Sequence, residues 1–274
     1  MDIPVVIVHM NNVPYLKPVI ATARKFNSRV ILIGNQGAGE SGAPAEFARF
    51  EPYAQEAAYF QTIYQHLSSN PYGFELFCFQ RWFVLRDYLE SQNFDLCFAM
   101  DSDVLFFANA GSEFTRLFNP ECEFTLLNGT SGGSSFFTRK SLAHFCRFLR
   151  ETYEKKARPG FRSLTDTFSE FQRSNRAGGV CDMTLFRLFA QETKPCFGEM
   201  CSVVDGATYD RNINLSDGYE MSGSMKRVYA CGGLPYCKFL DQGALVRFNT
   251  LHFQGSAKQW LPAVADEVLR SGVS

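Results

Sequence analysis

The first 34 residues decide the fold class. The stretch IPVVIVHMNNVPYLKPVIATARKFNSRVILIG, residues 3–34, begins and ends with runs of apolar, β-branched residues. Such runs are typical of strands that are buried on both faces. Between them Asn12 can cap a helix, Pro14 fits its first turn, and an amphipathic pattern continues to Phe26. A strand, a helix and a second strand predict parallel strands joined by a right-handed crossover.

Patterns further along the chain extend this β-α-β unit. Residues 35–47 are rich in Gly and polar residues, so we expect a loop there, and residues 194–249 predict an irregular segment with short strands. The remaining periodic segments predict strands at 95–100, 123–128 and 134–139, and helices at 53–67, 73–92, 140–156, 165–174, 181–192 and from 261 onward. The sequence therefore predicts an α/β fold, with a central, mostly parallel sheet flanked by helices and a small antiparallel part.

Composition indicates a globular protein and argues against several partners. The chain has 274 residues, of which 46% are hydrophobic and 28 are Phe, which is enough to form a large core rich in aromatic rings. The formal net charge is −1, so no basic field is available to hold a nucleic acid. Because no internal repeat or linker is evident, we expect a single domain over residues 1–274.

The N-terminus and the cysteines bear on location. Residues 1–10 lack the basic region and the long apolar run of a signal peptide, and no window approaches the length of a membrane span. The nine cysteines are scattered, without histidines at the spacing of a zinc site. Reduced, partly buried thiols are therefore favoured over a metal or disulfide framework, and we expect a cytoplasmic protein.

Two aspartates interrupt an apolar run. In FDLCFAMDSDVLFF, residues 94–107, Asp101 and Asp103 follow a predicted buried strand. In an open parallel sheet ligands bind beyond the carboxyl ends of the strands, and two carboxylates one residue apart point the same way in extended backbone. A divalent cation would remove their mutual repulsion, and oxygen ligands suit Mg²⁺ or Mn²⁺. The alternative is a pair of solvated turn residues.

A second motif lies near the C-terminus. In HFQGSAK, residues 252–258, His252 can complete a metal site with two carboxylates. Gly255 allows backbone amides to approach an anion, and Lys258 can neutralise a phosphate. The alternative is a loop histidine followed by a surface lysine.

These motifs resemble those of a known family. FAMDSDVLFF, residues 98–107, resembles the D-x-D motif of the GT-A glycosyltransferases. HFQGSAKQW, residues 252–260, resembles the H-x-x-G-x-x-K-P-W motif of the glycogenin and bacterial α-galactosyltransferase group. The resemblance extends over residues 3–260 and departs from the motif at Gln259, where that group often has Pro.

The resemblance implies a metal-dependent transfer of sugar from a nucleotide sugar, expected to be a UDP-sugar, to a saccharide or glycan. Residues 1–107 would form the nucleotide-binding half and residues 108–274 the acceptor-binding half. Mn²⁺ or Mg²⁺ would be held by Asp101, Asp103 and His252. The residues expected to contact the donor are His9, Asn11, Asn12, Asn35, Arg81, Asp101, Ser102, Gly255 and Lys258.

The same resemblance suggests a catalytic base. Asp182 lies in the first turn of a predicted helix, where the helix dipole favours an ionised carboxylate that can accept the acceptor's proton. A base of this kind implies inversion at the anomeric carbon, whereas a retaining enzyme of the same fold would not need one. Asp182 as a helix cap, a sugar nucleotidyltransferase, and a non-catalytic sugar-nucleotide-binding module are the remaining alternatives.

Overall fold

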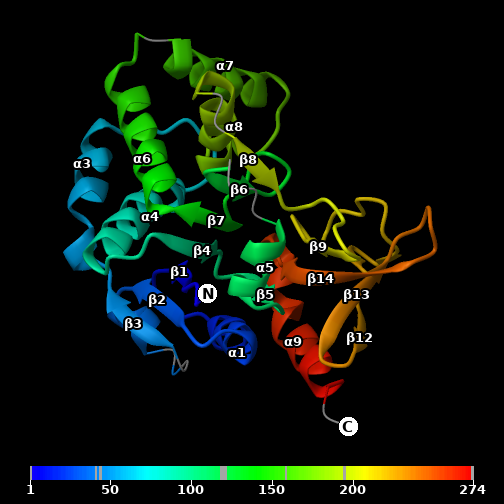
Figure 1. The fold of residues 1–274 in the computed structure, drawn as a ribbon. Helices are drawn as coiled ribbons and strands as arrows, with labels where there is room; N and C mark the ends of the chain where they lie inside the picture. The colour runs from blue at the N-terminus through cyan, green and yellow to red at the C-terminus, as the bar shows by residue number, and fades with distance from the viewer. Residues whose placement is uncertain are drawn as a thin grey trace.

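Two β-sheets organise the protein. The computed structural model describes residues 2–40, 42, 45–117, 122–157, 159–193 and 196–272. Within these residues the main sheet has seven strands and a second sheet has five (Figure 1). No helix in the described part of the chain has both the length and the hydrophobicity that a membrane crossing requires.

The main sheet is mostly parallel, as predicted. In spatial order its strands are β3 (Glu46–Arg49), β2 (Val30–Gly34), β1 (Val5–Val8), β4 (Leu96–Met100), β7 (Ser134–Thr138), β6 (Phe124–Leu126) and β8 (Phe197–Glu199). β1 pairs in parallel with β2 and β4, and β2 pairs in parallel with β3. β7 is antiparallel to both β4 and β6, while β6 and β8 are parallel.

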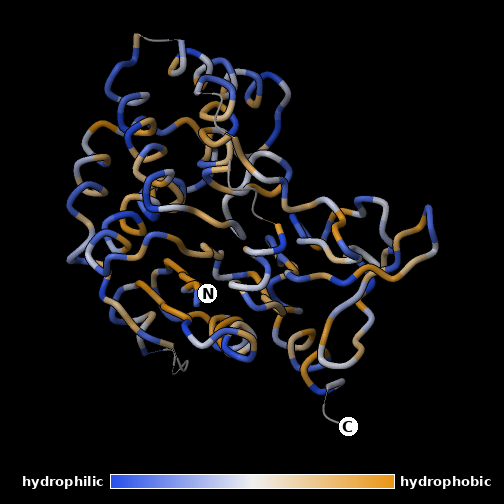
Figure 2. The backbone as a smooth tube through the Cα atoms, in the orientation of Figure 1, coloured by the Kyte–Doolittle hydropathy of each residue, from blue (hydrophilic) through white to orange (hydrophobic). Residues whose placement is uncertain are grey.

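Helices cover both faces of this sheet. Because side chains alternate along a strand, Val5 and Ile7 of β1 pack into a hydrophobic cluster on one face and Val6 packs into a second cluster on the other. On the face of Val5 lie α1 (Leu16–Phe26) and α9 (Leu261–Arg270), and on the face of Val6 lie α3 (Gln55–Ile63), α4 (Tyr72–Ser91), α6 (Arg139–Glu154) and α8 (Asp182–Thr193). Figure 2 shows hydrophobic residues concentrated on the central strands between these layers.

The second sheet joins the C-terminal part of the chain to the strand that follows the two aspartates. β14 (Leu245–His252) pairs antiparallel with β13 (Leu234–Lys238) and β5 (Val104–Phe106), and parallel with β9 (Ala207–Tyr209). Phe98 of β4 and Phe106 of β5 stack with their ring centroids 4.4 Å apart, which fixes the second sheet against the first. The fifth strand of this sheet is β12 (Tyr229–Cys231), which pairs with β13.

The remaining elements of the described structure are α2 (Gln36–Gly39), η1 (Glu51–Tyr53), α5 (Ala110–Leu117), α7 (Pro159–Arg173), β10 (Met221–Ser222), β11 (Met225–Lys226) and η2 (Gly255–Trp260).

Several predicted elements differ from the structure. The loop predicted at 35–47 contains α2 and the edge strand β3, whose side chains are largely exposed and so lack the pattern of a buried strand. Asn12 does not cap α1, because the helix begins only at Leu16, and the helix predicted at 53–67 is confined to α3. The helix predicted at 165–174 begins at Pro159. Residues 41, 43 and 44 of the predicted loop, and 194 and 195 of the predicted irregular segment, lie outside the described residues.

Candidate active site

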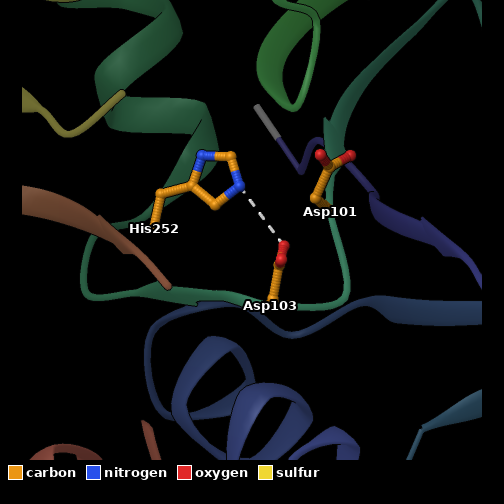
Figure 3. Close-up of side chains that lie close together, drawn as sticks. All are labelled: Asp101, Asp103 and His252. Atoms are coloured by element: carbon orange, nitrogen blue, oxygen red, sulfur yellow. Dashed lines mark ion pairs between the residues drawn. The ribbon is translucent and has the colours of Figure 1, made fainter. Parts of the chain in front are cut away.

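Asp101, Asp103 and His252 converge where the two sheets meet. Asp101 follows β4, Asp103 precedes β5, and His252 ends β14, where it pairs in register with Val104. One potential ligand atom from each of the three side chains lies within 4.8 Å of the others (Figure 3). Two carboxylates and an imidazole at this spacing can hold a divalent metal ion.

The backbone between the aspartates is a turn and not the extended segment that we predicted. The amide of Val104 donates to the carbonyl of Asp101 at 3.2 Å, which closes the turn around Ser102 and Asp103. The amide of Phe253 donates to the carbonyl of Asp103 at 2.9 Å, so this turn is also bonded to the segment after His252. The two carboxylates therefore converge through the turn and the packing of β14.

Cations surround Asp103. Its Oδ1 lies 3.3 Å from His252 Nε2, and its Oδ2 lies 3.0 Å from Lys258 Nζ. Burial opposes ionisation of Asp103, but the hydrogen bond and charge of His252, together with Lys258, lower the pKa of this carboxyl. Burial favours a neutral His252, yet Asp103 raises the pKa of the imidazole. A metal ion would thus compete with a proton for His252.

Arg81 connects Asp101 to Asp182. The Arg81 guanidinium is ion-paired with Asp101 through Nη1 and with Asp182 through Nη2, the latter at 2.7 Å. Trp82 Nε1 also donates to Asp182, at 3.0 Å, and the amide of Met183 donates to the other carboxylate oxygen at 3.0 Å. Asp182 begins α8, as predicted, and is 5% exposed. It is therefore a buried carboxylate with three hydrogen-bond donors, one of which is a guanidinium.

A glycine allows Asp101 to lie close to the neighbouring strand. The amide of Asp101 donates to the carbonyl of Gly133 at 2.8 Å. A Cβ atom on Gly133 would lie 2.5 Å from Asp101 Oδ2, which is too close for any other residue without a shift of the carboxylate. Gly133 therefore allows the Asp101 carboxylate to lie against the segment that precedes β7.

The loops after β1 and β2 form the edge beside this cluster. Asn11 and Asn35 are joined by two hydrogen bonds, one from the Asn11 amide at 2.8 Å and one from Asn35 Nδ2 at 3.0 Å. Asn35 also caps α2 by accepting from the amide of Ala38. Burial and then the charge of Lys258 lower the pKa of His9 to about 4, so its ring is neutral at pH 7. His9 Nε2 is buried without a hydrogen-bond partner in the described residues, and the residue lines the cleft.

A cleft of about 1270 Å³ contains most of the predicted site residues. Gly255 lines it with a φ of 59°, a left-handed conformation that glycine adopts without strain. The predicted residues that line the cleft are His9, Asn11, Arg81, Asp101, Ser102, Asp103, Asp182, His252, Gly255 and Lys258. Asn12 and Asn35 lie in the adjoining loops and are not among the lining residues.

The sequence prediction missed a further acidic residue in this cleft. Glu75 lines the cleft but is only 2% exposed. It lies in the first turn of α4, where acidic residues are common because they complement the helix dipole, so its sequence context did not distinguish it. Its burial could be seen only in the folded chain.

No family model matches the sequence, and no curated protein matches it. Among solved structures, the apo form of mouse xyloside xylosyltransferase 1 is 10% identical, with a TM-score of 0.50 over 76% of this chain and 88% of that one. A glycosyltransferase involved in the glycosylation of the major capsid of PBCV-1 is 9% identical, with a TM-score of 0.42 over 96% of this chain and 98% of that one. From the likeness to the mouse enzyme, together with the topology of the main sheet, the chain has the GT-A fold that its D-x-D motif predicted.

Proposed function

We propose that the protein is a glycosyltransferase that moves a sugar from a nucleotide-sugar donor, expected to be a UDP-sugar, to a hydroxyl group of a saccharide or glycan. The observation that carries the proposal is the convergence of Asp101, Asp103 and His252 in a large cleft at the carboxyl edge of the main sheet. The GT-A fold of the chain supports the same assignment, although fold alone does not define an activity.

The three candidate ligand side chains fit a hard or borderline divalent cation. Asp101, Asp103 and His252 offer oxygen and nitrogen ligands, which suit Mn²⁺ or Mg²⁺ bound together with phosphate oxygens. When bound, such an ion supplies Lewis-acid stabilisation of the charge that develops on the departing diphosphate. Lys258, which is partly exposed in the cleft, would neutralise a phosphate as a point charge. Arg81 would lie between the diphosphate and the transferred sugar.

The edge formed by the loops after β1 and β2 would hold the nucleoside. His9 offers a neutral imidazole with a buried, unpartnered Nε2 to the bound donor. The hydrogen-bonded pair of Asn11 and Asn35 fixes the shape of this edge before a ligand arrives. Asn12 and Ser102 would add polar contacts from the two adjacent loops.

Thermal stability provides the first test. We expect one nucleotide sugar, a UDP-sugar, to raise the unfolding midpoint of the native protein by roughly 5–10 °C at saturation with Mn²⁺, because only the folded state binds it. The shift should largely disappear with EDTA in place of Mn²⁺. Equal shifts with and without the metal would contradict the proposed role of the cluster, and stabilisation without any donor turnover would favour a binding module.

We further propose that Asp182 is the catalytic base of an inverting reaction. Its place at the start of α8 beside Arg81 puts a carboxylate next to the expected sugar position. In the present arrangement Oδ2 accepts hydrogen bonds from Arg81 and Trp82, whereas Oδ1 accepts one bond among the described residues, from the amide of Met183, and keeps a lone pair for the acceptor's proton. The retaining route is the second candidate, and it is favoured by the ion pair of Asp182 with Arg81, which gives this carboxylate a positioning role instead.

Product stereochemistry distinguishes the two routes. With an α-linked donor, the inverting route is expected to yield a β-linked product in the NMR spectrum. Asp182→Asn should then lower kcat by roughly 10²–10⁴-fold, which is the usual contribution of a general base. An α-linked product would show that Asp182 is not the base, and would assign it to the positioning of Arg81.

A further inference from the structure

The wall of the cleft formed by α4 extends beyond the expected donor site. Arg81, which is paired with Asp101 and Asp182, lies near the metal cluster, and Cys78 and Glu75 follow it toward the N-terminus of the helix. The rise from Arg81 to Glu75 is about 9 Å at 1.5 Å per residue. All three side chains line the cleft, so Glu75 marks a part of the same cavity that lies farther from the metal.

The two carboxyl oxygens of Glu75 differ in their hydrogen bonding. Oε1 accepts a hydrogen bond from Asn70 Nδ2 at 2.6 Å, which ties the start of α4 to the preceding turn. The Ser68 hydroxyl acts on this carboxyl as a weak donor, but Oε2 is buried and has no hydrogen bond of normal geometry among the described residues. A buried carboxyl oxygen without a well-formed hydrogen bond is unfavourable, and native proteins retain such groups mainly where a ligand or water completes them.

The surroundings of Glu75 make it a strong hydrogen-bonding group for a neutral ligand. Burial raises the pKa of Glu75, and the nearby carboxylate of Asp182 acts in the same direction. The hydrogen bond from Asn70, the charge of His66 and the hydrogen bond from Ser68 act against them. In this low-dielectric setting a hydrogen bond to the carboxyl is stronger than it would be in water. A second anion next to Asp182 would be repelled, so a hydroxyl group fits Glu75 better than a phosphate does.

Aromatic and apolar side chains line the same cleft. Phe74 is adjacent to Glu75 and 58% exposed, and Met183, next to Asp182, is 41% exposed. Phe171 also lines the cleft, with the guanidinium of Arg176 over its ring at 4.4 Å. Sugar rings present apolar C–H faces together with hydroxyl edges, so a buried carboxyl flanked by exposed apolar surface matches them on both counts.

We propose that Glu75 binds the saccharide acceptor, with Oε2 accepting a hydrogen bond from one of its hydroxyl groups while Phe74 packs against the sugar ring. This inference rests on the proposed glycosyl transfer and assigns the acceptor to the α4 wall of the cleft. Glu75 is thereby a substrate-binding residue, and its contribution appears in the acceptor KM and not in donor binding.

The experiment compares the native protein with Glu75→Gln in Mn²⁺. The donor is the nucleotide sugar that stabilises the native protein most, and the acceptors are the methyl glycosides of glucose, galactose, mannose and xylose. We expect Glu75→Gln to raise the acceptor KM about tenfold or more, because a hydrogen bond to a buried carboxyl is lost. Hydrolysis of the donor in the absence of an acceptor should remain within twofold of the native rate. The thermal shift that the donor produces should equal the native shift within error.

The matched control is Glu90→Gln, the same chemical change at an exposed position of the same helix. It should leave both acceptor and donor kinetics unchanged. If Glu75→Gln does not fold, Phe74→Ala gives the same readout, because Phe74 lies largely outside the core.

Three results would overturn the inference. They are an acceptor KM in Glu75→Gln equal to the native value, an equal loss of donor hydrolysis, and a native protein whose donor turnover responds to none of the methyl glycosides. In each case Mn²⁺-dependent binding and hydrolysis of the donor would still support the proposed function. If the native protein neither binds nor hydrolyses any donor, the proposed function itself is wrong.

Discussion

Asp103→Asn is expected to lower metal-dependent turnover of the nucleotide sugar roughly 10³-fold, which corresponds to about 4 kcal/mol of transition-state stabilisation. Asp103 is the only residue of the cluster that contacts both His252 and Lys258 in the described structure. An amide keeps the shape of the side chain but binds a divalent cation far less well than a carboxylate. The site would therefore lose its metal, and Lys258 would lose the carboxylate that balances its charge. Donor hydrolysis and calorimetric titration with Mn²⁺ measure the two effects.

A matched change at the opposite end of β4 provides the control. The side chain of Asp95 is 85% exposed, and its ion pair with Arg139 lies at the surface, so Asp95→Asn should cost at most about 1 kcal/mol. Its kinetics and Mn²⁺ affinity should match those of the native protein. A native level of Mn²⁺-dependent turnover in Asp103→Asn, with an unchanged unfolding midpoint, would show that the metal ion is bound elsewhere.

Lys226→Met is expected to lower the free energy of unfolding by about 3–5 kcal/mol, because it leaves a buried carboxylate without its cation. Lys226 and Asp210 form an ion pair of 2.8 Å in which each side chain is only 1% exposed. Asp210 also accepts a hydrogen bond from the backbone amide of His252 at 3.0 Å. Loss of the pair should therefore weaken Mn²⁺ binding as well, since the third ligand loses its support. Urea unfolding at pH 7 measures the stability.

The loss of stability caused by the unpaired charge can be measured separately from the loss caused by the smaller side-chain volume. Lys238→Met makes the same change at an exposed position of β13 and should alter stability by no more than about 0.5 kcal/mol. Adding Asp210→Asn to Lys226→Met removes the unpaired charge while keeping an oxygen for the amide of His252, so part of the stability should return. If the double variant is no more stable than the single one, the loss does not arise from the buried charge.

The parts of the fold that were predicted correctly are those in which one local pattern dominates. β1 and β2 are fully apolar because both faces of each strand are covered, and this gives unbroken apolar runs rich in Val and Ile. β3 could not be recognised in this way, because Glu46–Arg49 lies at the edge of the sheet with mainly exposed side chains and is held by backbone pairing to β2. Backbone hydrogen bonds place few requirements on the identity of the side chains, so a strand held mainly by them is hard to recognise from sequence.

The residues of the candidate site likewise divide into those that a local sequence pattern indicated and those that only the folded chain brings together. Asp101 and Asp103 lie at a strand end, as predicted, and the structure brings His252 within reach of them, so that its expected role as third ligand stays a prediction. The ionic partners could not be predicted, since Arg81 meets Asp182 only when α4 packs beside α8. A polar residue on an amphipathic helix is expected to face solvent, so the burial of Glu75 likewise depends on tertiary packing.

The position of His252 at the end of β14 has a consequence for biosynthesis. The two candidate carboxylate ligands, Asp101 and Asp103, are translated early, whereas the imidazole follows only at the end of β14. A nascent chain that has emerged through β13 carries both carboxylates but lacks the strand that closes the cluster. Under the proposed function, metal would thus be retained only after synthesis through β14, and a ribosome stalled earlier would expose a chain with an open edge at β5.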